Sequence, residues 1–204
     1  YALVAGTGDD DNLLFAINTN ELESNADFSG LAGSVLSIRV RSTDSSGLSF
    51  EKVLNLSVIA VSQQPVINEI HYNPPDNTLR EEFVELYNPG PDPIDLTGYR
   101  LSGAIDFPFT NGPVMSADSF LVIAQHPPTL GGSPLGPYTG ALSSDGETLR
   151  LRDMNDQVID RVEYKVGFPW PIGPDGDGPS MQLIHPGLDN DLGSSWRGAL
   201  PTPG

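Results

Sequence analysis

The fold is decided by two stretches, Val66-Ile67-Asn68-Glu69-Ile70-His71-Tyr72 and Glu82-Phe83-Val84-Glu85-Leu86-Tyr87-Asn88. Both are rich in β-branched and aromatic residues and are bounded by Pro, Gly, Asn or Asp, which is the pattern of β-strands. A cluster of prolines and a glycine follows, and then the run Ile94-Asp95-Leu96-Thr97-Gly98-Tyr99. The region from Val66 to Gly98 is therefore predicted to be antiparallel sheet broken by turns.

Each of the first two strands carries an acid among apolar residues, Glu69 in one and Glu85 in the other. A buried charge without partners is costly. These carboxylates are therefore expected either to face water on an open side of the sheet or to belong to a polar cluster.

The order of these motifs resembles the lamin tail domain family. That family has an Asn-Glu-Ile strand, a Phe-aliphatic-Glu-Leu-x-Asn strand and an Asp-Leu-x-Gly-aromatic turn, which match residues 68–70, 83–88 and 95–99 here. The resemblance covers residues 65–188. It implies an immunoglobulin-like β-sandwich that mediates interactions rather than chemistry, although a fold alone does not fix function.

Composition narrows the class of protein. The chain has 204 residues, 10 Lys+Arg, 27 Asp+Glu and a net charge of −17. Such a chain is repelled by phosphate backbones and anionic lipid, so nucleic acid is not expected as a partner. No apolar run reaches the roughly 18 residues of a membrane span. The absence of cysteine excludes a disulfide, a thiolate metal site and a thiol nucleophile.

The first 63 residues read as a smaller β unit. Leu36, Ile38 and Val40 alternate with polar residues, and a second strand-like run extends over residues 50–61. A complete sandwich needs about 100 residues. We therefore expect this first unit to be incomplete, and the whole chain to be a bacterial multidomain fragment whose targeting segments lie elsewhere.

This unit resembles the C-terminal part of a bacterial cadherin-like repeat, most specifically over residues 39–52. The resemblance implies calcium held by carboxylates, and it assigns Asp27 and Asp44 as the metal-ligating residues. A calcium site needs 6–8 oxygen ligands, yet Ser29 and Ser46 occupy the places of the other expected acids. The alternative is that both aspartates form turns.

The predicted domains are a partial cadherin-like sandwich (1–63), a lamin-tail-like immunoglobulin-fold sandwich (64–188) and a tail or linker (189–204). The fold class is all-β, with two tandem antiparallel sandwich units. Within the second unit, residues 147–152 and 157–164 form the clearest hairpin, with Asn155 expected in the left-handed conformation of its turn.

The residues of the chain allow three other kinds of site. Glu69 and Glu85 could serve a two-carboxylate hydrolase if they shared a cleft, but strand glutamates more often accept hydrogen bonds. The histidines (His71, His126 and His185) lack metal-ligand spacing and are expected on the surface or in loops. Trp170 and Trp196 could stack on sugars, although a tryptophan is usually largely buried.

The sequence thus predicts a non-catalytic adhesion, interaction or spacer segment of a large acidic secreted or cell-surface protein. The expected partners are other proteins or surface polysaccharide, together with neighbouring domains of the same chain. A carbohydrate-binding accessory module is the alternative, and a two-carboxylate hydrolase comes third.

Overall fold

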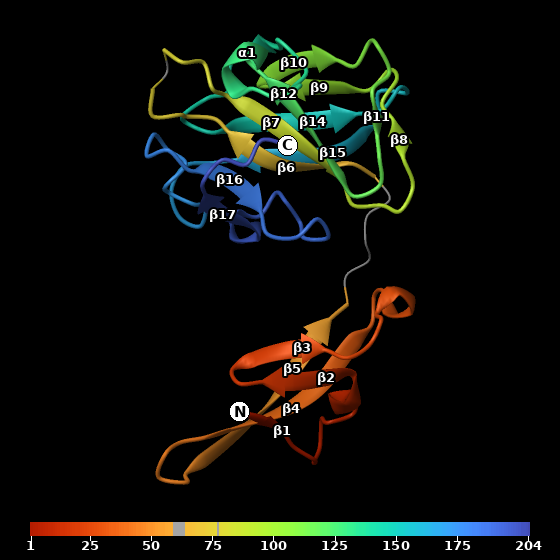
Figure 1. Cartoon of the computed structure of the whole chain (residues 1–204), viewed down its shortest axis with the longest axis vertical. Helices are drawn as coiled ribbons and strands as arrows, with labels where there is room; N and C mark the ends of the chain where they lie inside the picture. Colours follow the sequence, from red (N-terminus) through yellow and green to blue (C-terminus); the bar gives the residue numbers. More distant parts are fainter. Residues whose placement is uncertain (59–63, 77) are drawn as a thin grey trace. The chain divides into compact units, whose positions relative to one another are not determined.

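The computed structural model describes residues 1–58, 64–76 and 78–204, and these residues are nearly all β (Figure 1). The chain separates into two compact units, Tyr1–Ala60 and Val61–Gly204. The predicted boundary at residues 63 and 64 falls beside a stretch, 59–63, that lies outside the described residues.

The N-terminal unit consists of a three-stranded sheet and a separate hairpin. The sheet has the order β1-β4-β5, and the hairpin pairs β2 with β3. The elements are β1 (Ala2–Leu3), η1 (Asn12–Leu14), β2 (Phe15–Asn18), β3 (Glu21–Ser24), η2 (Ser29–Leu31), β4 (Val35–Thr43) and β5 (Ser49–Ser57).

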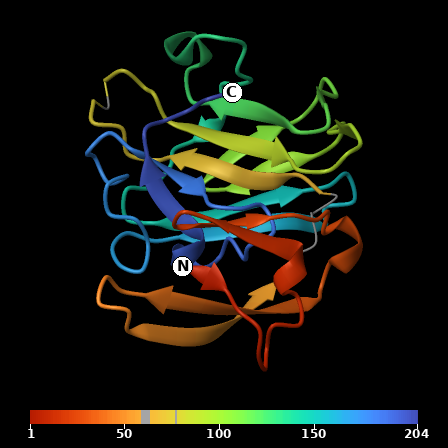
Figure 2. The same cartoon turned by 60° about the horizontal axis from the view of Figure 1, so that its bottom comes forward.

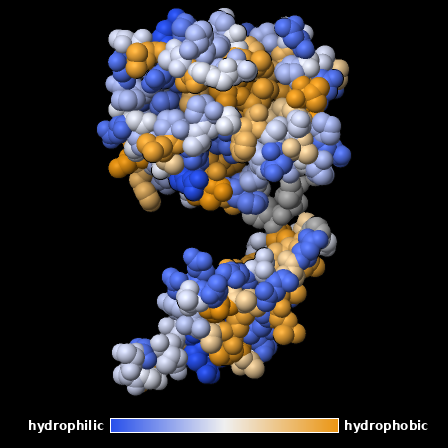
Figure 3. Space-filling view, viewed as in Figure 1, coloured by the Kyte–Doolittle hydropathy of each residue, from blue (hydrophilic) through white to orange (hydrophobic). Residues whose placement is uncertain are grey.

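The core of this unit is small. Phe15, Leu36 and Ile38 are its buried residues, and partly buried residues such as Val40 and Leu54 pack against them. The prediction that Leu36, Ile38 and Val40 of β4 face the core is therefore confirmed. Many other apolar side chains of the unit are exposed, Leu13 and Phe50 among them, and apolar surface is visible on this unit in Figure 3.

The C-terminal unit is a sandwich of two five-stranded sheets and a short ribbon. The sheet orders are β12-β7-β6-β16-β17 and β13-β10-β9-β14-β15, and β8 pairs with β11. The first sheet contains β6 (Val66–His71), β7 (Phe83–Asn88), β12 (Ser119–Ala124), β16 (Ser180–Leu183) and β17 (Trp196–Ala199). The remaining elements are β8 (Ile94–Asp95), β9 (Arg100–Gly103), β10 (Ile105–Pro108), β11 (Val114–Met115), α1 (Pro127–Leu130), β13 (Thr139–Gly140), β14 (Glu147–Arg152), β15 (Val158–Tyr164) and η3 (Gly193–Ser195).

One large core lies between the two sheets, as the all-β immunoglobulin-like prediction requires. Ile70, Val84 and Ile123 contribute to it from the first sheet, and Leu149 and Val162 from the second. Because side chains alternate along a strand, the neighbours of these residues point to the opposite, outer face of each sheet.

The predicted hairpin is present with one difference in its turn. Leu149 pairs with Val162 as expected. The positive φ, however, belongs to Asp156 (+62°) rather than to Asn155. The register shifts between Leu151 and Arg152, and with this bulge Val158 pairs with Arg152 and is exposed.

Residues 189–204, predicted to be a tail or linker, are part of the sandwich in this structure. They form η3 and β17, and β17 pairs antiparallel with β16. The physical reason is Trp196, which is buried in the core and holds the last strand against the sheet.

Candidate functional site

A row of polar side chains crosses the outer face of the β12-β7-β6-β16-β17 sheet. The register pairs Glu85 with Glu69, Glu69 with Gln182, and Gln182 with Arg197. Val122 of β12 is the cross-strand partner of Glu85 at the other end. The two acids that stood apart in the sequence therefore lie directly opposite each other on neighbouring central strands.

Both acids are buried, each with 1% of its surface exposed. Glu69 accepts hydrogen bonds from the Thr202 backbone N–H (3.0 Å) and hydroxyl (2.8 Å). Glu85 accepts from the Asn68 side-chain amide (3.0 Å) and the Gly204 backbone N–H (2.8 Å). All four carboxylate oxygens thus have a donor, which is how a sheet accommodates two buried charges.

The donors come largely from residues 200–204, which we call the C-terminal strap. After β17 the strap runs over β16 and β6 to β7 (dark blue in Figures 1 and 2). Gln182 fixes its start by donating to the Leu200 carbonyl (2.8 Å) and to the Thr202 hydroxyl (3.2 Å).

The sequence of the strap suits this path. In an extended chain the backbone N–H groups of alternate residues point to the same side. Thr202 and Gly204 turn their N–H groups to the carboxylates, whereas Pro201 and Pro203, which have no N–H, occupy the positions between them. Proline also stiffens the strap and lowers the entropy lost when it is ordered.

The strap is held almost entirely by polar contacts. Leu200, Thr202, Pro203 and Gly204 are exposed, so docking buries little apolar surface. Hydrogen bonds to charged groups contribute about 1.5–3 kcal/mol each, and ordering the backbone costs about 1–2 kcal/mol per residue. Three bonds to the carboxylates and two from Gln182, the latter of about 0.5–1.5 kcal/mol each, exceed the cost of ordering five residues by only about 1–2 kcal/mol. The strap is therefore docked for most of the time but weakly held.

The carboxylates repel each other across the two strands. Burial raises the pKa of Glu85, and the neighbouring charge of Glu69 raises it further, while the bonds from Gly204 and Asn68 lower it. A hollow of about 420 Å³ lies beside the strap, and Glu69 and Glu85 are both among the residues that line it. Each oxygen of the acid pair accepts one hydrogen bond, and three of these four bonds come from the strap, so in this arrangement the pair anchors the strap.

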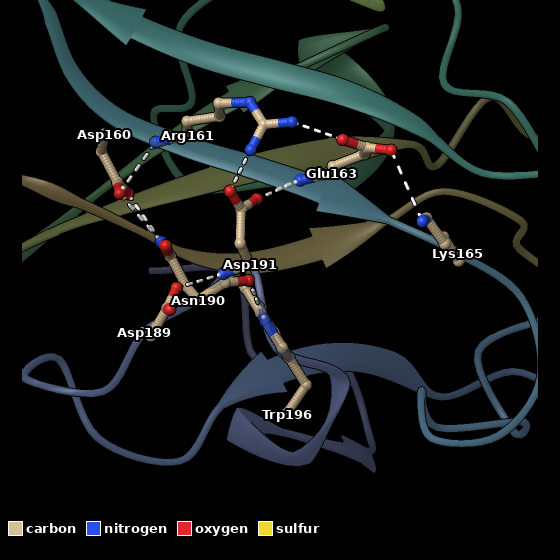
Figure 4. A network of polar contacts seen from close by, with 8 residues as sticks. All are labelled: Asp160, Arg161, Glu163, Lys165, Asp189, Asn190, Asp191 and Trp196. Atoms are coloured by element: carbon tan, nitrogen blue, oxygen red, sulfur yellow. Dashed lines mark hydrogen bonds and ion pairs between the residues drawn. The ribbon is translucent and has the colours of Figure 1, made fainter.

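A second polar network joins the loop at residues 189–191 to β15 (Figure 4). Asp160 accepts both bonds from the Asn190 amide (3.0 and 2.8 Å) and one from the Ile67 backbone N–H of β6 (2.7 Å). The Asn190 carbonyl in turn accepts from the Trp196 indole N–H (2.8 Å). Burial raises the pKa of Asp160.

The same loop covers an exposed sheet edge. β15 is the last strand of its sheet, and Asp191 accepts the backbone N–H of Glu163 from that edge (2.7 Å). Arg161 pairs with both Asp191 and Glu163. A covered and charged edge resists pairing with another chain. The acidic loop 189–191 therefore both holds the edge strand β15 in place and protects its edge.

The three histidines differ in their surroundings. His185 is exposed and accepts the Gly187 N–H (3.0 Å), and His126 bonds the Thr129 hydroxyl (2.7 Å). His71 corrects the prediction of a surface residue, because it lies buried in β6 against Phe83. Neither of its ring nitrogens has a hydrogen bond of good geometry within the described residues. Burial lowers its pKa, and this effect outweighs the backbone groups of Glu81 and Gly178, which raise it.

The two tryptophans proposed for sugar stacking, Trp170 and Trp196, are internal. Trp170, Trp196 and Tyr164 are buried in the core, so the tryptophans offer no open platform. Phe168 is 97% exposed. A stacked pair that sequence reasoning missed, Tyr87 and Phe120, lies beside the strap with ring centroids 4.6 Å apart. Only the pairing of β7 with β12 brings these two rings together.

The predicted calcium ligands lie in the N-terminal unit. The Asp44 carboxylate accepts three hydrogen bonds within its own turn, from the Ser46 N–H and hydroxyl and the Leu48 N–H. Asp27 is exposed between β3 and η2. Across the described ranges, no group of three or more Asp, Glu, His or Cys side chains is placed to hold a metal ion. Calcium at Asp27 and Asp44 stays a prediction.

Comparison with known proteins gives one family. The model of the Lamin Tail Domain matches residues 60–166, and no curated protein matches. Among solved structures, the crystal structure of a DUF4876 family protein from Bacteroides thetaiotaomicron matches with 13% identity and a TM-score of 0.47, over 92% of this chain and 87% of that chain.

Proposed function

The chain belongs to the lamin tail domain family, and from this membership we propose that it is a non-catalytic segment that mediates adhesion or spaces other modules in a large acidic secreted or cell-surface protein. The observation that carries the proposal is the engagement of all four oxygens of Glu69 and Glu85 by Asn68 and the strap. The most deeply buried acids of the sheet hold its shape.

Charge supports the choice of partner. At −17 the chain repels nucleic acid and anionic lipid, so the proposed partners are proteins, neighbouring domains or surface polysaccharide. In the part of the chain that is described, no helix is long and apolar enough to cross a membrane.

The anchoring of the C-terminal unit suits a spacer. Chain tension would enter at β6, whose Ile67 N–H is held by Asp160. Once the weakly held strap has opened, the tension would leave through β17, which pairs with β16. Both points of load therefore fall on strands of one sheet.

A pulling experiment tests the spacer role. The chain is placed between reference domains and stretched by single-molecule force spectroscopy. The C-terminal unit is expected to unfold in one event, at a higher force than the N-terminal unit with its small core. Asn190→Ala should lower that force, whereas Asp177→Asn, at an exposed position, should not. Gradual extension of the C-terminal unit at low force would contradict the role.

An activity assay tests the proposal that the chain is not an enzyme. The chain is incubated with polysaccharides and with chromogenic glycosides, and released sugar is measured. We expect none beyond background. Glycoside hydrolysis that disappears in Glu85→Gln while the fold persists would reject the proposal in favour of a two-carboxylate enzyme.

A carbohydrate-binding module is the second candidate, favoured by the stacked pair Tyr87 and Phe120 beside the polar hollow. Phe120 is 46% exposed, and the open face of an aromatic ring can stack on a sugar. If this function holds, a polysaccharide raises the melting temperature of the native chain but not that of Phe120→Ala. Phe168→Ala, which removes a fully exposed ring outside this hollow, is the matched control.

Calcium binding by Asp27 and Asp44 belongs to the proposal as well. Asp44→Asn removes the charge but keeps the oxygen that accepts all three turn bonds. If calcium binds there, CaCl₂ raises the melting temperature of the N-terminal unit in the native chain and has a smaller effect in this variant. An equal melting temperature in calcium and in chelator would rule the site out.

A further inference from the structure

The C-terminal strap occupies the outer sheet face in the way that a bound peptide would. Its contacts with the face are backbone and hydroxyl donors on Glu69 and Glu85 and two acceptors for Gln182. Nothing in this set requires that the segment come from the same molecule.

The receptor residues form independently of the strap. Glu69, Glu85 and Gln182 project from three adjacent strands whose pairing and apolar inner faces fix their positions. The row is therefore a preformed set of acceptors and one donor, spaced by the sheet itself.

The strap is also open on both sides. One hollow, of about 420 Å³, reaches it from Asn68 and Tyr87. Another, of about 330 Å³, reaches Pro203 and Gly204 from the loop at Leu130–Pro134. A segment that is exposed, flanked by open space and held by polar bonds belongs to the part of a fold that opens first.

We infer that the row Glu85–Glu69–Gln182 is a binding site for an extended segment with proline at alternate positions, and that it accepts the strap of a second copy of this chain in exchange for its own. The strap that lies on the row defines the chemistry of the segment that the site accepts. Such a segment has two N–H donors two residues apart, prolines, which lack an N–H, at the positions before and between them, and a threonine hydroxyl that contacts both Glu69 and Gln182. This inference does not depend on the spacer role.

The native chain masks the site. A tethered segment competes at an effective concentration of about millimolar, so a free peptide at micromolar concentration finds few empty sites. Thr202→Pro should unmask them. It removes both donors to Glu69 while keeping an extended backbone, and the strap contributes nothing to the core.

The first test measures peptide binding by fluorescence anisotropy. The probe is the labelled, end-blocked peptide Ala-Leu-Pro-Thr-Pro-Gly. We expect Thr202→Pro to bind it at least about tenfold more tightly than the native chain. The same peptide N-methylated at its threonine and glycine nitrogens, which lacks the two donors, should not bind. Equal binding by both chains, or by both peptides, would overturn the inference.

The second test identifies the occupant by complementation. Thr202→Pro carries an empty receptor and a defective strap, while the double variant Glu69→Gln, Glu85→Gln carries an intact strap and a defective receptor. Each alone should sediment as a monomer, and an equimolar mixture should form a heterodimer. A mixture that stays monomeric while the peptide binds would exclude a second copy as the occupant. Melting curves of each variant, run beside these measurements, check that its core is intact.

Discussion

Glu69 and Glu85 are direct cross-strand partners, and both are buried, with 1% of each residue exposed. Two like charges opposed across neighbouring strands destabilise a sheet by themselves. Their position is explained by the donors that reach them: Asn68 from the same strand, and the backbone of a segment more than a hundred residues away in sequence.

The acid pair predicts a dependence of stability on pH. The pKa of Glu85 is raised by burial first and by Glu69 as well. A carboxyl whose pKa is higher in the folded chain contributes stability that is fully present below its unfolded pKa and is lost as the pH rises through its folded pKa. Glu85→Gln cannot titrate. The melting temperature of the variant minus that of the native chain should therefore increase from pH 4.5 to pH 7.5. A difference that stays constant would contradict the assignment.

His71 predicts the opposite trend. Burial lowers its pKa from the ordinary 6.5, so its contribution to stability is present above that value and is lost as the pH falls toward the folded pKa. His71→Leu removes two ring nitrogens that lack a hydrogen bond of good geometry within the described residues and should be neutral or stabilising at pH 7.5. Between pH 6.5 and 5 the native chain should lose stability relative to this variant in urea unfolding. His185→Leu, at an exposed site, is the control and should show no such divergence.

The hydrogen bonds between Asn190 and Asp160 predict how much the acidic loop 189–191 stabilises the edge strand β15. Asn190→Ala deprives Asp160 of two bonds and should lower the free energy of unfolding by about 2 kcal/mol. Asn190→Asp should be worse at neutral pH, because it brings a third carboxylate to Asp160 and Asp191, and should partly recover at pH 5. Denaturant unfolding at the two pH values measures both effects. If the Ala variant were the less stable of the two at pH 7.5, the network would be misassigned.

Gly103 predicts a steric requirement at the end of β9. Its φ is +110°, and a Cβ there would overlap the Thr148 carbonyl oxygen of the neighbouring strand β14. Gly178 has nearly the same φ, +106°, but open space around it. Gly178→Ala should cost only the backbone strain, about 1–3 kcal/mol. Gly103→Ala should cost clearly more or prevent folding. Comparing the melting temperatures of the two variants separates the cost of backbone strain from that of steric overlap. An equal decrease in both variants would show that β9 and β14 move apart at little cost.

Strand positions and inward faces could be predicted from the chain because they depend on local alternation. Leu36 and Ile38 are buried where their alternation with polar residues indicates. The prediction for Asn155 was wrong because the turn closes with the Asp156 N–H on the Asp153 carbonyl and the Asp153 N–H on the Gln157 carbonyl, and this arrangement gives the positive φ to Asp156. His71 was misplaced because sequence spacing cannot show that a strand is covered on both faces.

The sequence alone determined that this is an acidic, cysteine-free, all-β chain and that Glu69 and Glu85 sit within strands, since composition and alternation are properties of neighbouring residues. Tertiary structure alone decided what those acids contact. Their partners, Thr202 and Gly204, are 133 and 119 residues away, and such contacts follow from the order and register of strands, which no local pattern encodes. The same holds for Asp160 with Asn190, and for the aromatic pair Tyr87 and Phe120.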